Sequence, residues 1–321
     1  MPLSKNRADA LQEIDRMREK KSSMAIFCTA SHWNTEAILK AANDYAKTHG
    51  IHNIPIAIAI TYSYRHMSQA SRVTYSGDLK TGFISIMEYI KRLCDYDDSP
   101  YKNVKVLTHL DHADPELDQW ALVEGTNYLA SVMFDAQRYP LKDNMEMTKN
   151  YVKQYSDRVL VEGIMDELSV KGDIKEAGED DYISRAVEYV KATGIDFLVA
   201  NLGTEQQSDS AGNSVYLEDR AVNLTAALGK PMLVLHGTSC LNDEQISSLA
   251  DDGVIRVNMW TRIAREAGQY ASERLFSRAR RIFTGDFEAA ESNQYLRDSI
   301  DKASQIMYNM LELLRYSNLS E

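Results

Sequence analysis

Hydrophobic residues fall into short continuous runs, and each run is followed by a polar turn and then by a stretch with helical periodicity. Eight such runs occur, at residues 24–30, 54–61, 103–110, 129–135, 158–164, 196–202, 231–237 and 253–259. Helical stretches that end at a glycine lie between them, such as 34–50, 181–194 and 216–229. Strands that are apolar throughout, rather than in alternation, are typical of a parallel sheet covered by helices.

Eight β/α units within about 250 residues predict a (β/α)₈ barrel, also called a TIM barrel. An open doubly wound sheet is the competing arrangement, but no GxGxxG pattern follows the first run. We expect an N-terminal helix, a barrel over about residues 24–275 and a helical C-terminal extension over about 276–321. No linker or low-complexity segment interrupts the sequence, so residues 1–321 are predicted to form one domain.

Composition narrows the class of protein. The chain has 321 residues, is 44% hydrophobic and carries a formal net charge of -11. An acidic surface argues against binding to nucleic acid and to anionic membranes. The three cysteines, Cys28, Cys94 and Cys240, form no CxxC motif and do not suggest a disulfide scaffold. With neither a signal-peptide pattern nor an apolar run of spanning length, the sequence predicts a cytoplasmic protein.

In such a barrel the active site lies at the carboxyl ends of the strands, so polar residues that directly follow an apolar run are candidates. His109 lies within the third run, Asp111 and His112 directly follow it, and a helix is expected to open at Asp114-Pro115-Glu116. Strand alternation places His109 and Asp111 on one face. These residues suit a metal or proton-transfer site, but a helix cap with two packed histidines would give the same pattern.

The seventh and eighth runs also lead into polar residues. His236 ends the seventh run, and a loop of small residues precedes a helix expected to begin near Leu241. Small residues before a helix present backbone N–H groups, which suit a phosphate. The candidate phosphate-binding residues after these two runs are Gly237, Thr238, Ser239, Asn258 and Thr261. Ordinary turn and capping chemistry is the alternative interpretation.

Two further features involve carboxylates. Asp135 ends the fourth run and Glu162 lies within the fifth, where an unpaired charge is costly. They therefore require a cation, a histidine or a structural salt bridge.

After the sixth run, Gly203 permits a tight turn, and Glu205 and Gln206 are placed to reach the barrel mouth. The charged stretch 165–181 is either a lid or a solvated loop.

Five segments in order, HLDHA, SVMFDAQRYPLKDNM, NLGTEQQ, VLHGTSCLNDEQI and GVIRVNM, resemble motifs of the class II, metal-dependent fructose-/tagatose-bisphosphate aldolase family. The resemblance extends over about residues 24–270. It implies a (β/α)₈ barrel in which histidines hold a divalent ion, usually zinc, that polarises a ketose carbonyl. It also implies that an aspartate moves the proton.

Carried onto this sequence, the resemblance gives Asp111 the acid/base role and makes His112 and His236 metal ligands. Asp135, Glu162 and His109 are expected close to the metal site. The positions implied for binding substrate or phosphate are Gly203, Gly237, Thr238, Ser239, Asn258, Thr261 and Arg262.

The sequence departs from the family pattern at several positions. Gln206 stands where a third histidine is expected. Zn²⁺ is the expected ion, and oxygen ligation by Gln206 or Glu205, which would favour a harder ion, makes Mn²⁺ or Mg²⁺ the alternative. His32 and His66 are alternative ligands, because each follows a strand. Trp260 and Arg262 replace acidic residues after the eighth run. These two changes indicate a substrate other than fructose 1,6-bisphosphate.

The leading hypothesis is a metal-dependent aldolase that acts on a phosphorylated ketose through an enediolate, in a homo-oligomer (dimer or tetramer). The alternative is a non-catalytic sugar-phosphate-binding or partner subunit of the same fold with incomplete metal ligation. A lysine Schiff-base enzyme is disfavoured, because Lys105 lies early in its run and far from the barrel mouth.

Overall fold

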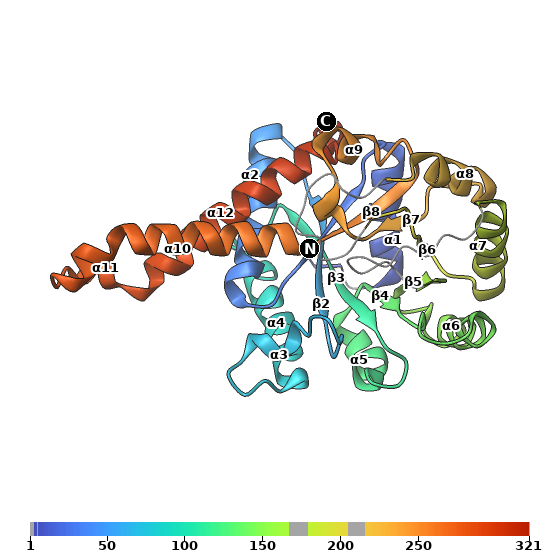
Figure 1. The fold of residues 1–321 in the computed structure, drawn as a ribbon, viewed down its shortest axis with the longest axis horizontal. Coiled ribbons are helices and arrows are strands. Elements are labelled where there is room, and N and C mark those ends of the chain that lie inside the picture. The colour runs from blue at the N-terminus through green and yellow to red at the C-terminus, as the bar shows by residue number, and fades with distance from the viewer. Residues whose placement is uncertain (1–2, 5, 167–178, 205–215, 321) are drawn as a thin grey trace.

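The computed structural model describes residues 3, 4, 6–166, 179–204 and 216–320. Eight parallel strands form a closed barrel in sequence order, with β8 paired to β1, which confirms the predicted fold (Figure 1). The strands are β1 Met24–Cys28, β2 Ile54–Thr61, β3 Val104–Ala113, β4 Ser131–Phe134, β5 Leu160–Ile164, β6 Phe197–Val199, β7 Leu233–Leu235 and β8 Val254–Met259.

Helices surround the barrel (Figure 1). They are α1 Arg7–Glu19, α2 His32–His49, α3 Ala70–Val73, α4 Leu79–Cys94, α5 Gln119–Val123, α6 Leu141–Tyr155, α7 Glu179–Thr193, α8 Glu218–Leu228, α9 Asp243–Ser248, α10 Thr261–Phe283, α11 Phe287–Ala290 and α12 Ser292–Leu313. Short 3₁₀ helices are η1 Glu124–Tyr128, η2 Thr238–Cys240 and η3 Tyr316–Leu319. None of the helices within these described ranges has the length and apolarity to cross a bilayer. The cytoplasmic location stays a prediction.

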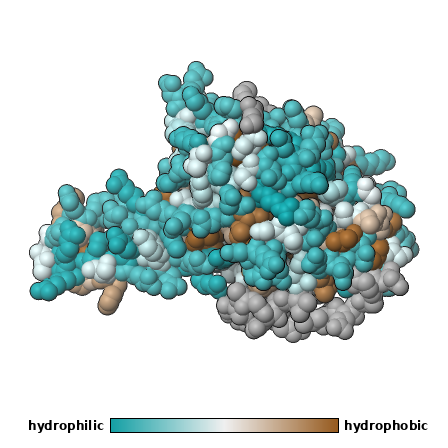
Figure 2. Space-filling model, turned by 90° about the horizontal axis from the view of Figure 1, so that it is seen from above, coloured by the Kyte–Doolittle hydropathy of each residue, from teal (hydrophilic) through white to brown (hydrophobic). Residues whose placement is uncertain are grey.

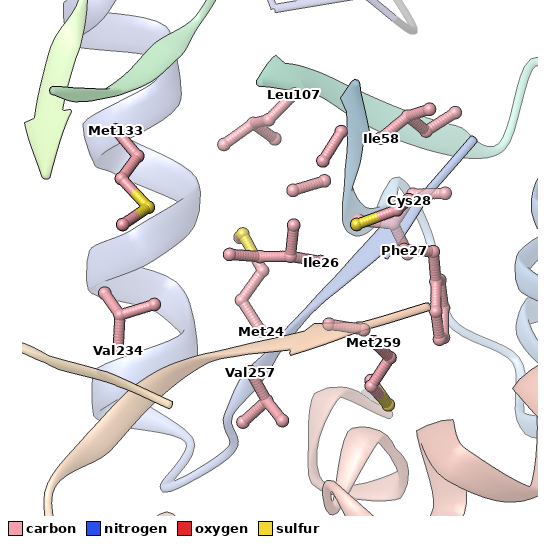
Figure 3. Close-up of a cluster of buried hydrophobic side chains, with 14 of the residues drawn as sticks. Met24, Ile26, Phe27, Cys28, Ile58, Leu107, Met133, Val234, Val257 and Met259 are labelled. Carbon is pink, nitrogen blue, oxygen red and sulfur yellow. The ribbon is translucent and has the colours of Figure 1, made fainter. Parts of the chain in front are cut away.

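Every residue of the eight strands is buried, which explains why the strands are apolar throughout rather than in alternation. Figure 3 shows part of the core, where side chains from β1, β2, β3, β4, β7 and β8 lie together. Burying each large apolar side chain stabilises the fold by roughly 1.5–3 kcal/mol. Because the interior is filled by packed side chains, the candidate catalytic residues lie at the strand ends.

Strand β3 is longer than predicted and continues through Asp111 and His112 to Ala113. The expectation that a helix opens at Asp114-Pro115-Glu116 was wrong. The Asp114 carboxylate accepts hydrogen bonds from the backbone N–H groups of Glu116 and Leu117, at 2.8 and 3.0 Å. These bonds hold a turn, and α5 begins only after it, at Gln119.

The C-terminal part of the chain forms an arm, defined here as the outer part of α10, with α11 and the start of α12. Helix α10 packs against α12, and α12 packs against α2. The arm projects away from the barrel (Figure 1), and Figure 2 shows it standing clear of the body of the molecule. Helix α10 runs without a break across the boundary expected near residue 276.

Candidate metal centre and active site

A cluster of two imidazoles and one carboxylate lies at the carboxyl end of the barrel. Ligand atoms of Asp111, His112 and His236 all lie within 4.8 Å of one another, and the three side chains are buried. Strand β3 supplies the first two, and His236 directly follows β7. Residues far apart in the sequence meet here because parallel strands end at the same edge of the barrel.

His112 is held in an unusual backbone conformation. Its φ is +48°, in the left-handed region that non-glycine residues seldom adopt, and the β3–β4 register shifts between Leu110 and Ala113. Its Nδ1 lies 2.7 Å from Asp135 Oδ2, and Tyr64 stacks on its ring with centroids 4.1 Å apart. These contacts fix the imidazole. Burial opposes its charged form, but the Asp111 and Asp135 carboxylates outweigh burial and raise the pKa of His112.

His236 enters the cluster from the end of β7, whereas Asp111 and His112 come from β3. The Thr204 hydroxyl donates to the His236 carbonyl oxygen at 2.6 Å, which links the ends of β6 and β7. Burial lowers the pKa of His236 to about 4, so the imidazole is neutral at neutral pH, the form that binds a metal. Within the described residues, its Nε2 atom has no hydrogen-bond partner.

Asp111 lies between the histidines and the cavity. Burial, the largest single effect, would raise its carboxyl pKa, but the neighbouring histidines, His112 foremost, together outweigh burial and hold the pKa below its ordinary value. Asp111 is therefore ionised at neutral pH. Oδ1 is buried and has no partner among the residues that the structure describes, whereas Oδ2 lies 3.8 Å from Cys28 Sγ. An acceptor atom of a charged group is thus available to a ligand.

The cavity beside Asp111 has an empty volume of about 530 Å³, including its opening. At one end it is lined by Gly237, Thr238, Ser239, Trp260 and Thr261. Gly237 has φ +80°, which a residue with a side chain would strain to adopt. Helix α10 begins at Thr261, so its N-terminal N–H groups and positive dipole end face this part of the cavity. We name this end the anion cradle.

Asn258 lies on β8 between the cradle and Asp111. Its side-chain oxygen is 3.0 Å from Cys28 Sγ, and its Nδ2 atom is buried without a protein partner among the described residues. An unpaired buried donor is costly, so this amide is placed to bind a ligand oxygen.

A buried ion pair lies deeper in the barrel. Arg256 and Glu162 are both fully buried, and the Arg256 guanidinium donates to the Glu162 carboxylate and, at 3.2 Å, to the Ser131 hydroxyl. The other Glu162 oxygen is 3.5 Å from His109 Nε2, and His109 Nδ1 is 2.9 Å from Ser131 Oγ. Burial raises the pKa of Glu162 to about 7 despite Arg256. His109 is therefore part of this lower layer and not of the ligand cluster.

Several residues that the sequence predicted for the site do not line the cavity or lie outside the described residues. Gly203 makes a tight turn with φ +78° but does not line the cavity. Arg262 Nε pairs with Glu266 on α10 at 3.0 Å, and it is likewise outside the cavity lining. Glu205 and Gln206, the expected remaining metal ligands, lie outside the described residues, as does the centre of the charged stretch 165–181.

The two alternative histidines are also apart from the cluster. His32 faces α4, where Nε2 is 3.3 Å from Ser85 Oγ and the ring packs edge-on against Tyr89. His66 packs against the far side of the site, 5.3 Å from the Tyr64 ring. Neither belongs to the group of ligand atoms around His112.

Sequence reasoning missed Cys28, Tyr64, Thr204 and Arg256. A charged residue inside the apolar run 253–259 was a usable signal for Arg256, because such a residue needs a buried partner such as Glu162. Tyr64 gave no signal, since its place depends on the path of the loop after β2.

The residues present suit a divalent ion. The two imidazoles offer nitrogen donors of the kind that such ions bind, and one of these atoms, His236 Nε2, lacks a hydrogen-bond partner among the described residues. Asp135 fixes the His112 ring through its other nitrogen, an arrangement usual for metal-binding histidines.

Comparison with known proteins identifies the family of the chain. The Fructose-bisphosphate aldolase class-II family model matches residues 9–318. Fructose-bisphosphate aldolase of Streptococcus pneumoniae is 33% identical over 198 residues, which cover 59% of this chain and 61% of the relative. The Giardia intestinalis fructose-bisphosphate aldolase is 30% identical over 161 residues, 48% of this chain and 49% of the relative. The alignments thus span about three fifths or less of these relatives.

Solved structures agree on the fold. Fructose-bisphosphate aldolase from Campylobacter jejuni superposes with a TM-score of 0.75 at 16% identity, covering 98% of this chain and 95% of that one. The YdjI aldolase from Escherichia coli gives 0.67 at 18% identity, with 99% and 100% covered. Because the family model matches nearly the whole sequence, the chain belongs to the class II fructose-bisphosphate aldolase family.

Proposed function

We propose that the protein is a metal-dependent aldolase that breaks and forms a C–C bond in a phosphorylated ketose. The observation that carries this proposal is the juxtaposition of the Asp111 carboxylate with two imidazoles and the anion cradle in one cavity. This set supplies a base, a metal site and a phosphate site within the reach of one small sugar phosphate.

His112 and His236 would hold the ion, which is Zn²⁺ in the simplest assignment. Mn²⁺ and Mg²⁺ are alternatives, because Gln206 replaces the expected third histidine. When bound, the ion supplies a Lewis acid that stabilises the negative charge developing on the ketose carbonyl oxygen.

Asp111 moves the proton. A ketose breaks between the carbon next to the carbonyl and the following carbinol carbon, and the hydroxyl on that carbinol must lose its proton as the aldehyde forms. Asp111 is ionised, and its Oδ1 is available to accept this proton. In the reverse reaction the same oxygen returns the proton to the aldehyde. No protein lysine is required.

The cradle orients the substrate. A phosphate on the ketone side accepts hydrogen bonds from the backbone around Thr238 and Ser239 and lies at the start of α10. Asn258 Nδ2 is then placed to donate to a substrate oxygen between the phosphate and Asp111.

Removal of the metal tests the proposal. We expect purified protein to contain a divalent ion and to cleave at least one ketose mono- or bisphosphate, and a chelator should abolish cleavage reversibly. The measurements are elemental analysis and a coupled assay for the aldehyde and ketone products. Cleavage that persists in protein free of metal would contradict the mechanism.

A non-catalytic sugar-phosphate-binding subunit is the alternative, favoured by Gln206 at the third ligand position. It would be supported by phosphate binding without cleavage of any ketose phosphate in the presence of Zn²⁺, Mn²⁺ or Mg²⁺. Schiff-base chemistry has little support, because Lys105 lies at the start of β3, where its Nζ atom contacts Asp9 of α1 at 2.7 Å.

We also propose that the arm joins two copies of the chain. Phe276, Phe283 and Phe287 at its outer end are 84%, 89% and 81% exposed, an unusual cost for aromatic side chains on a free surface. Changing all three to serine is expected to convert a dimer or tetramer into monomers, measured by light scattering. Tyr75→Ser, which alters a fully exposed ring on the barrel body, is the matched control. An unchanged mass in the triple variant would contradict the proposal.

A further inference from the structure

The loop after β2 forms one wall of the cavity, through Thr61, Tyr64, Met67 and Gln69. Internal hydrogen bonds hold this loop. The Thr61 N–H donates to Gln69 Oε1 and the Gln69 N–H donates to Thr61 Oγ1, each at 2.9 Å. The Thr61 hydroxyl also donates to the Met67 carbonyl oxygen. The wall is therefore preorganised.

This wall lies across the cavity from the anion cradle. The strand order places β1 and β8 between β2 and β7, so the two loops face each other over the mouth. Asp111, on β3, is paired in register with Thr61 at the base of the wall. A sugar with its phosphate in the cradle and its breaking bond at Asp111 must therefore direct its far end, the future aldehyde, toward this wall.

Tyr64 and Met67 give the wall an aromatic and apolar surface, while Thr61 Oγ1 and Gln69 Oε1 are used in hydrogen bonds within the loop. The Tyr64 ring lies parallel to His112, with an interplanar angle of 7°, and Met67 adds a thioether next to it. Trp260, which directly follows β8, adds a further ring to the lining, but at the cradle end of the cavity. Such surfaces bind carbon chains and sugar faces, whereas burying a phosphate dianion requires cations or several N–H donors. Among the residues that the structure describes, the lining includes neither lysine nor arginine.

Two arginines line a second pocket, which Tyr64 and His112 also line. Arg65 and Arg138 line that pocket together with the carboxylates of Asp114 and Asp135. Arg138 Nε is 2.8 Å from Asp114, and its Nη2 atom is 2.8 Å from Glu116. Carboxylates thus offset the charge there, and Arg65 is the cation whose contribution has to be tested.

We propose that the β2-loop wall selects an uncharged aldehyde, so that the preferred substrate is a ketose 1-phosphate and not a ketose bisphosphate. Tyr64 and Met67 are the specificity-determining residues. This inference rests on the proposed aldolase function and adds the chemical class of the far end of the substrate.

The experiment compares kcat/KM for ketose 1-phosphates and for bisphosphates of the same chain length, with metal-loaded enzyme. Wild type is expected to favour the monophosphate by about tenfold or more. Met67→Arg places a cation in the wall and should move the ratio toward the bisphosphate by about tenfold. Met67→Gln, polar but uncharged, is the matched control and should leave the ratio near that of wild type. Arg65→Ala should leave the ratio unchanged.

A wild-type preference for the bisphosphate that disappears in Arg65→Ala would overturn the inference and leave the aldolase function standing. A ratio that does not respond to Met67→Arg in a folded variant, checked by circular dichroism, would also overturn it. Absence of cleavage of both substrate classes would overturn the proposed function itself, and the inference with it.

Discussion

Replacing Asp111 with asparagine is expected to lower kcat for aldol cleavage by about 10²–10⁴-fold, the usual contribution of a positioned acid or base. Asparagine has nearly the same shape, so it preserves packing in this buried site next to Cys28. It cannot accept a proton at neutral pH. The fold should be intact, because Asp111 lies at the carboxyl end of the barrel and is not part of the hydrophobic core.

The measurement is kcat together with the metal content of the purified variant, since Asp111 Oδ atoms lie close to both imidazoles. A large loss of kcat with unchanged metal content supports the proton-transfer role. If metal content falls in parallel with the rate, Asp111 acts as a ligand and the assigned role is wrong. Asp97→Asn, on an exposed turn, controls for the loss of one negative charge.

Replacing Arg256 with methionine is expected to lower the free energy of unfolding by about 3–5 kcal/mol, because it leaves the buried Glu162 carboxylate without its counter-ion. Methionine is long and unbranched, so the loss comes mainly from the charge and not from an empty volume. Urea unfolding at pH 7.5 or above provides the measurement. Arg256→Lys keeps a positive charge and should cost less.

The pH dependence of the unfolding free energy shows whether the destabilisation comes from the lost charge or from lost packing. Burial already raises the pKa of Glu162 to about 7 in the presence of Arg256, and removing Arg256 raises it further. A carboxyl group whose pKa is higher in the folded state favours folding below its unfolded pKa, and this contribution is lost as pH rises through the folded value. The destabilisation by Arg256→Met should therefore shrink as pH falls from 8 toward 5.

A second variant separates charge from packing. The double variant Glu162→Gln, Arg256→Met contains no buried charge at either position, so it should be more stable than Arg256→Met alone at pH 8. Equal stability of the single and double variants, or a destabilisation that does not change with pH, would show that Arg256 acts mainly by filling space.

The strand pattern was predictable because every strand is buried on both faces, which leaves continuous apolar runs in the sequence. The proximity of Asp111, His112 and His236 was predictable from the same pattern, because barrel geometry brings the strand ends together. The end of β3 was misjudged, because local turn signals at Asp114 and Pro115 do not reveal whether a strand continues to Ala113.

Contacts made by loops were not predictable. Tyr64 reaches His112 only because hydrogen bonds between Thr61 and Gln69 close the loop after β2, and no periodic pattern encodes such a closure. The left-handed backbone conformation at His112 was not predictable either, because histidine has no strong preference for this conformation.

The length of α10 has a mechanical consequence. Its first residue, Thr261, lines the anion cradle, and its last, Phe283, lies on the arm about 33 Å away, at about 1.5 Å per residue along a helix of 23 residues. Because a single unbroken helix behaves as a stiff rod, a partner that held the arm would also restrain the orientation of Thr261. Any such restraint would couple assembly with substrate affinity, and each would then change the other by the same factor.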